Sequence, residues 1–271
     1  MPTFHQPGQT IIFEIDGHFA GRLLSTDAKD VIPQTSDYAQ GQSVWLCSLF
    51  GSRSLVDWIV STAASRFNRR SVKLTIIDQV RKTGTVLSMS ECLLGKVTLP
   101  ALDKASSADA FMRLVVKPER WMKTALGEIQ TISIPPPKEP SKVSEFEFVV
   151  DGLDDAKFVQ RVESVTLEQG IKVVYEHNSS LSEPTRISDS NIVISLPVQN
   201  GTGFLKWSDE TRNSGNLREK TGAVRYLANK KVALQANLYE LSLIRTTRSG
   251  PSLKVEMACG RMDFDGGHVD F

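Results

Sequence analysis

The residues that come closest to a chemical site lie at the carboxyl end of the 271-residue sequence. The stretch Asp263-Phe264-Asp265-Gly266-Gly267-His268-Val269-Asp270 brings three carboxylates and an imidazole together, and such groups are ligands for calcium or zinc. Its spacing matches no ion-binding loop, and the Gly-Gly pair favours a loose chain. We therefore interpret this stretch as a flexible tail that binds no metal.

No other pattern in the sequence supports catalysis. Gly51-Ser52-Arg53-Ser54 lacks the second glycine of a nucleophile elbow, and no glycine-rich phosphate or dinucleotide loop occurs. The four histidines are dispersed, without metal-ligand spacing. Cys47, Cys92 and Cys259 are too scattered for a disulfide framework or a zinc site. The sequence thus predicts no catalytic residue, no cofactor, no metal and no enzyme activity.

The densest basic cluster consists of Arg66, Arg69, Arg70 and Lys73. Recognition of nucleic acid would favour aromatic residues interleaved with these cations, but only Phe67 is present. The formal net charge of +1 also gives no overall attraction to polyanions. We expect the cluster to face a water-filled lumen or another subunit, and we expect no specific nucleic-acid recognition.

Composition places the chain among ordinary globular proteins, with 40% hydrophobic and 23% charged residues. The first residues show no basic region followed by an apolar core, so no signal peptide is predicted. No run of about 18 apolar residues occurs, so no membrane insertion is predicted either.

A proline-rich stretch divides the sequence into two similar halves. Between Ile132 and Lys142 four prolines favour extended backbone, which is typical of a linker. The first half opens with Phe13-Glu14-Ile15-Asp16-Gly17, and the second with Phe148-Val149-Val150-Asp151-Gly152. We predict a first domain over residues 1–132, a linker over 133–144 and a second domain over 145–271.

The predicted elements follow the same order in both halves. An apolar strand is followed by a glycine turn and a helix that contains a tryptophan, Trp58 or Trp207. In the first half Ser54 is the predicted N-cap, and the more polar second helix, with Gly215, is expected to be short. Turns are predicted at Gly84 and at 229–231. The predicted strands are 43–50, 70–78, 85–89 and 111–117 in the first half, and 191–198, 219–227, 232–238 and 253–259 in the second.

This agreement predicts a tandem duplication of a mainly β unit, a β-barrel or sandwich with one helix per domain. The helix of each unit would cover one edge or end of the sheet, because uncovered sheet edges expose unpaired backbone groups. Trp58 and Trp207 are predicted to be buried against the sheet as core residues, without a functional role.

The pattern resembles the tail-tube family of contractile phages and related injection systems. The resemblance rests on the opening strand with its glycine turn, the tryptophan helix, the strand from Arg69 to Asp78 and the closing strand from Phe111 to Lys117. It extends over most of residues 13–120 and, more loosely, over 148–264. It implies two tandem tail-tube-like domains.

The resemblance also implies an assembly. Tube-like domains join edge to edge in hexameric rings, and a chain with two such domains would make a pseudo-hexameric ring from three copies. We therefore expect a structural component of a phage tail or contractile injection system. It would be a homotrimer that continues or initiates the inner tube, at the junction between tube and baseplate hub. The expected partners are tube subunits and hub or spike proteins. Synthesis in the bacterial cytoplasm and incorporation into the particle would follow.

The polar stretches at 26–42 and 176–190 are candidates for contacts between subunits or rings. In tube-like folds this position carries a long hairpin or loop that points toward the adjacent ring. Solvated surface loops are the alternative interpretation. For the protein as a whole, the alternative is an adaptor or binding module with duplicated β-barrel domains that does not form rings alone. The candidate contact residues are Asp27, Lys29, Asp30, Asp37, Glu183, Arg186 and Asp189.

Overall fold

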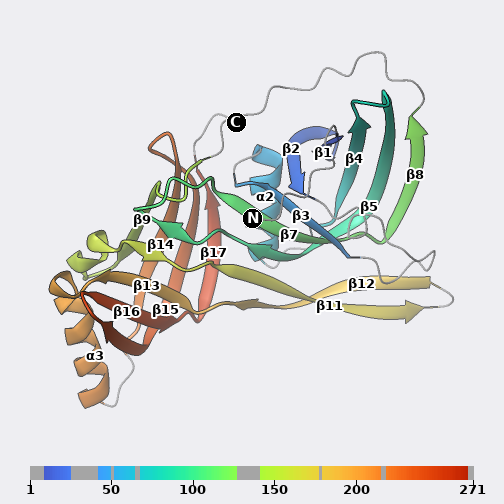
Figure 1. Ribbon diagram of the computed structural model, residues 1–271. Coiled ribbons are helices and arrows are strands. Elements are labelled where there is room, and N and C mark those ends of the chain that lie inside the picture. The colour runs from blue at the N-terminus through green and yellow to red at the C-terminus, as the bar shows by residue number, and fades with distance from the viewer. Residues whose placement is uncertain are drawn as a thin grey trace.

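The computed structural model describes residues 9–25, 42–49, 52–64, 68–126, 141–176, 179–214 and 218–267. Most of these residues lie in antiparallel strands that form two large, barrel-like sheets (Figure 1). The described residues contain two α-helices, α2 and α3, one in each half. The predicted mainly β fold with one helix per half is confirmed.

The strands of the first half close into a barrel. Pairing runs from β5 through β4, β1, β2, β3 and β7 back to β5, and β8 adds to the outer edge of β5. These elements are β1 (Gln9–Ile15), β2 (His18–Ser25), β3 (Ser43–Ser48), α2 (Arg53–Ala63), β4 (Arg70–Asp78), β5 (Thr83–Thr98), β6 (Leu102–Asp103), β7 (Phe111–Lys117) and β8 (Arg120–Leu126).

The second half builds a similar but open barrel. Pairing runs from β10 through β13, β16, β15 and β14 to β9, and β17 adds to β15. These elements are β9 (Phe146–Val150), η1 (Asp154–Phe158), β10 (Arg161–Val162), β11 (Thr166–Glu176), β12 (Ser179–Asp189), β13 (Ile192–Pro197), η2 (Val198–Asn200), α3 (Thr202–Ser214), β14 (Lys220–Ala228), β15 (Lys231–Ser249), β16 (Ser252–Ala258) and β17 (Arg261–Gly266).

Strand pairing repeats between the two halves. The pairs β1–β4, β2–β3 and β3–β7 correspond to β9–β14, β10–β13 and β13–β16. Likewise β4–β5, β5–β7 and β5–β8 correspond to β14–β15, β15–β16 and β15–β17. This repeated topology is the one that a tandem duplication produces.

Irregularities of the backbone recur at the same positions, which fixes a residue-by-residue correspondence. Glu91 in β5 and Glu240 in β15 both have φ of 54°, a left-handed conformation that is uncommon outside glycine. Farther along the two strands, a bulge occurs at Gly95 in the β5–β7 ladder and another at Ile244 in the β15–β16 ladder. Since bulges re-aim the strand, both long strands bend at equivalent points.

The opening motifs occupy equivalent turns. The Asp16 N–H donates to the Ser71 carbonyl at 2.8 Å, and the Asp151 N–H donates to the Thr221 carbonyl at 2.9 Å. Gly17 follows with φ of 81°, and the glycine after Asp151 has φ of 73°. Only glycine adopts such angles without strain, so both motifs need this residue at the turn.

The helices depart from the prediction in two respects. The N-cap of α2 is Ser52, whose Oγ accepts the Leu55 N–H at 3.3 Å, while Ser54 lies inside the helix. The second helix is not short, because α3 runs for 13 residues against 11 in α2. Buried Phe204 and Trp207 hold α3 against the sheet, so packing outweighs its polar composition.

Several strands are longer than predicted or were missed. Gly84 is not a turn, since it pairs with Ile77 inside β5, and the turn lies at 79–82. The 85–89 and 232–238 segments are parts of β5 and β15, which have 16 and 19 residues. The strands β8 and β17 were not predicted. The tail interpretation is wrong for 263–266, which lies in β17, while His268 lies outside the described residues.

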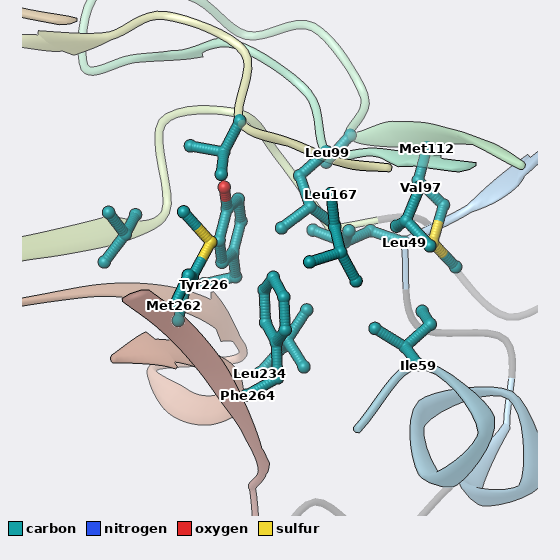
Figure 2. Close-up of a cluster of buried hydrophobic side chains, with 14 of the residues drawn as sticks. Leu49, Ile59, Val97, Leu99, Met112, Leu167, Tyr226, Leu234, Met262 and Phe264 are labelled. Atoms are coloured by element: carbon teal, nitrogen blue, oxygen red, sulfur yellow. The ribbon is translucent and has the colours of Figure 1, made fainter. Parts of the chain in front are cut away.

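One hydrophobic core connects the two halves. The predicted burial of Trp58 and Trp207 is confirmed, and their Nε1 atoms donate to the Asn68 and Arg218 carbonyls at 3.0 and 2.8 Å. Figure 2 shows where side chains of the two halves meet. The labelled residues are Leu49, Ile59, Val97, Leu99 and Met112 of the first half, with Leu167, Tyr226, Leu234, Met262 and Phe264 of the second.

The predicted linker falls mostly outside the described residues, which resume at residue 141. There the Ala110 N–H donates to the Ser141 carbonyl at 2.6 Å, and the Val143 N–H donates to the Ala108 carbonyl at 2.9 Å. The start of the second half is thus attached to the first, and the domain boundaries stay a prediction.

Candidate assembly interface

The junction between the two halves begins with a shared strand edge. In β11, Thr166, Leu167 and Glu168 pair with 96–98 of β5, so the β11–β12 hairpin of the second half extends the sheet of the first. Lys96 Nζ lies 2.8 Å from Glu168 Oε2 across this pairing. The hairpin therefore satisfies backbone groups that β5 would otherwise expose.

Side chains of the β11–β12 hairpin also pack closely against this edge of β5. A Cβ added to Gly95 would lie 3.3 Å from Cδ1 of Ile171, so the absence of a side chain lets the hairpin approach closely. The β5 residues beside it, Leu94 and Val97, are buried. This edge of β5 is thus apolar and covered.

A second part of the junction is the packing of α2 on β17. The helix contributes buried Val56, Ile59 and Ala63. From β17, buried Met262 and Phe264 belong to the same hydrophobic core as Ile59 (Figure 2). Helix and strand belong to different halves, so this contact buries apolar surface of both.

The third part is a buried ionic clamp. Glu119 Oε1 accepts the Ser182 N–H at 2.5 Å and lies 3.3 Å from Nη1 of Arg69. Nη2 of Arg69 donates to the Ser182 carbonyl at 2.5 Å, and its Nε lies 3.8 Å from Glu91. The side chains of Arg69 and Glu119 are only 15% and 7% exposed. Both backbone groups of Ser182, on the outer strand of the hairpin, are therefore held by the first half.

A short strand pair completes the junction. In β6, Leu102 and Asp103 pair with Val162 and Arg161 of β10, so an insertion between β5 and β7 extends the second sheet. The Leu99 N–H donates to the Val165 carbonyl at 2.8 Å beside it. Each half thus adds a strand to the other.

The predicted basic cluster does not form a patch of free cations. Arg69 belongs to the clamp, Arg70 lies 2.9 Å from Asp16, and Lys73 lies 3.3 Å from Glu14. Arg66 lies outside the described residues. Surface ion pairs of this kind contribute little to stability, so Arg69 is the member with a structural role. A role in a lumen stays a prediction.

The predicted contact residues divide between described and undescribed segments. Asp27, Lys29, Asp30 and Asp37 lie outside the described residues. In β12, Glu183 and Arg186 are exposed, and Asp189 ends the strand. The 179–189 part of the second polar stretch is strand β12 of the hairpin and contains buried Ser182, and contacts with an adjacent ring stay a prediction.

Sequence reasoning missed Glu91, Glu119 and Ser182. No motif marks them, because each is a single polar residue whose partner lies far away along the chain. The only indication came from the repeat, in which Glu91 of the first half is equivalent to Glu240 of the second. The counterpart of Glu119 is Gly260, where a Cβ would lie 2.3 Å from Oε2 of Glu240. The clamp is therefore a property of the internal junction alone.

The described residues show no metal-binding arrangement. No group of three or more His, Cys, Asp or Glu side chains among them is arranged to hold a metal ion. Within β17, Asp263 and Asp265 instead accept hydrogen bonds from Nδ2 of Asn237 at 2.9 and 2.6 Å. None of the described helices is long and apolar enough to span a membrane. Of the three cysteines, Cys47 and Cys92 are buried and Cys259 is half-buried.

No protein-family model matches the sequence, and no curated protein matches it. Among solved structures, similarity is found to a chain of the "Cryo-EM structure of the anti-feeding prophage (AFP) baseplate, 6-fold symmetrised". The sequence identity is 12% and the TM-score is 0.38, and the match covers 50% of this chain and 100% of the other.

Proposed function

We propose that this protein is a structural component of a phage tail or contractile injection system, and that three copies form a pseudo-hexameric ring. The observation that carries the proposal is the internal junction. One half of the chain binds the other through a strand edge, a helix and a strand, and the repeat supplies a second set of the corresponding elements.

The repeat favours a ring for a geometric reason. If the surfaces of the second half bind the first half of the next chain as the two halves bind each other, the contact is heterologous. Repetition of a heterologous contact gives a closed ring when the rotation fits, and an open filament when it does not. The resemblance of the sequence to tube proteins favours closure, with six similar domains around a channel.

A ring of this kind would fit between partners of different symmetry. Three identical chains present threefold symmetry to a hub or spike, while six similar barrels present a nearly sixfold contour to tube subunits. We therefore place the protein at the junction of the inner tube with the baseplate hub. It is made in the bacterial cytoplasm and incorporated into the particle, and it acts by assembly and not by catalysis.

Light scattering on the purified chain across concentrations, followed by negative-stain images, tests this proposal. A mass of three chains and rings with six lobes around a central hole would support it. A strict monomer at every concentration, without rings even when tube or hub partners are added, would overturn it. That result would favour the adaptor with duplicated barrels that does not form rings alone.

A further inference from the structure

We infer that the second half carries a binding surface for a second copy of this chain, made of the outer edge of β15 at 244–247 and the outer face of α3. The surface that it binds on the other copy includes β8. The inference rests on the proposed ring, and it names the residues through which one chain would contact the next.

The strand edge follows from the correspondence between β5 and β15. In the first half, Lys96, Val97 and Thr98 pair with β7 on one side and with β11 on the other. Their counterparts in the second half are Arg245, Thr246 and Thr247, which pair with β16. On the opposite side of 245–247 no described strand is paired, so this edge has the position of the covered edge of β5.

Exposure supports the same conclusion. At the bulge of β15, the side chain of Ile244 is 49% exposed, whereas the equivalent Gly95 is covered by Ile171 of the hairpin. An apolar side chain beside an unpaired strand edge is a feature that folded proteins usually cover, because it promotes association. A strand from another chain would cover both the side chain and the edge.

The helix face follows from the correspondence between α2 and α3. Trp58 and Trp207 make equivalent hydrogen bonds, which aligns the two helices. The α2 residues that face β17, among them Val56 and Ile59, then correspond to Leu205 and Ser208, and these α3 residues are half-buried in the chain alone.

The complementary surface is β8, the counterpart of β17. In the ladders with β5 and β15, Trp121 corresponds to Met262 and Lys123 corresponds to Phe264. Met262 and Phe264 are buried, whereas Lys123 is exposed and Trp121 is half-buried. Among the described residues, no helix packs on β8 as α2 packs on β17.

The placement of these elements suits head-to-tail contact. Figure 1 shows α3 at one end of the molecule and β8 at the other. A chain therefore cannot join its own α3 to its own β8, but one copy can offer α3 to the β8 of the next. Within the chain, α2 packs on β17, with Val56 against Gly266. The corresponding contact would bring Leu205, Ser208 and the adjacent exposed Asp209 to β8 of the other copy, which carries Lys123.

The charges at this contact allow a direct test. Sedimentation velocity across concentrations would compare the wild-type chain with Lys123→Asp, Asp209→Lys and the double variant. All three variants change exposed side chains, so the fold is retained. Each single reversal is expected to weaken self-association at least about tenfold, because it places like charges together. The double variant is expected to restore association, since the opposite charges meet again. Lys172→Asp, an exposed charge reversal on β11, is the matched control and should change nothing.

The strand edge is tested separately with Ile244→Lys, which places a charge where a strand would be added. Weakened association would support the edge, and Val80→Lys, at another exposed apolar side chain, is the control.

If the wild type forms rings that all these variants leave unchanged, the inferred surfaces are wrong while the ring proposal stands. Open filaments that the charge swap controls would support the surfaces and overturn the closed ring. A strict monomer would overturn both.

Discussion

Substitution of Glu119 by alanine tests the clamp that attaches the β11–β12 hairpin to the first half. The carboxylate is almost fully buried and accepts from both Arg69 and the Ser182 N–H. Its removal leaves a buried N–H without a partner, which costs about 1–3 kcal/mol. It also leaves the buried guanidinium, which still donates to the Ser182 carbonyl, with the longer contact to Glu91, at 3.8 Å, in place of its closer carboxylate partner. We expect a total loss of about 3 kcal/mol, at the low end for a broken buried ion pair.

The assay is urea denaturation of the full chain at neutral pH. With a denaturant dependence of about 3 kcal/mol per molar urea, the midpoint should fall by about 1 M. Amide hydrogen exchange should also accelerate at Ser182, because the hairpin loses its outer attachment. Glu183→Ala is the matched control, since this carboxylate is the next residue in β12 and is exposed, and it should change stability by less than about 0.5 kcal/mol.

A double variant separates the charge from the contact. Arg69→Met combined with Glu119→Leu removes both charges and keeps apolar bulk, and replacement of a buried ion pair in this way is often nearly neutral. The double variant should thus be more stable than Glu119→Ala. Equal effects of Glu119→Ala and Glu183→Ala would refute the reasoning, because the clamp would then contribute nothing measurable.

Three further predictions concern the core and the backbone. Burial raises the pKa of the Cys47 and Cys92 thiols from 9.0 to about 12. Above pH 9 the unfolded chain loses protons that the folded chain keeps, so urea denaturation under reducing conditions should show stability falling from pH 9 toward 12, and less steeply in Cys47→Ala. Gly222→Ala would place a methyl group 2.5 Å from a backbone oxygen of β9 and should lower the melting temperature far more than Gly250→Ala, whose only cost is its φ of 57°. Tyr226→Phe should raise the melting temperature, because the buried hydroxyl has no hydrogen-bond partner among the described residues.

The parts of the fold that could be predicted from the sequence are those with local patterns. Alternation identified 70–78 and 111–117 with the bounds that the structure has, and the position of Trp58 identified the helix. In contrast, β8 has no fully buried side chain, so neither face shows an apolar period. A strand held mainly by backbone pairing along an edge leaves almost no trace in the sequence.

The candidate interface could not be predicted because its residues depend on contacts between distant segments. The sequence indicated Arg69 as a member of a basic cluster but did not indicate its contact with Glu119, which belongs to no motif. The repeat was visible through Phe13 and Phe148, but it did not reveal that the hairpin of the second half extends the sheet of the first. That pairing is fixed by the register of Glu168 against Lys96, which only the folded chain defines.

The difference between the internal junction and the surface inferred for a second copy has a physical reason. Within the chain, the junction is always formed, so buried Val97 and Phe264 cost nothing in solubility. Their counterparts in the inferred surface, half-buried Thr246 and exposed Lys123, would stay in contact with water until another copy binds. A large apolar patch at that position would cause premature or nonspecific association. In the proposed ring, the polar counterparts would give a weaker contact that forms at the high local concentration of an assembling particle and that charge complementarity makes selective.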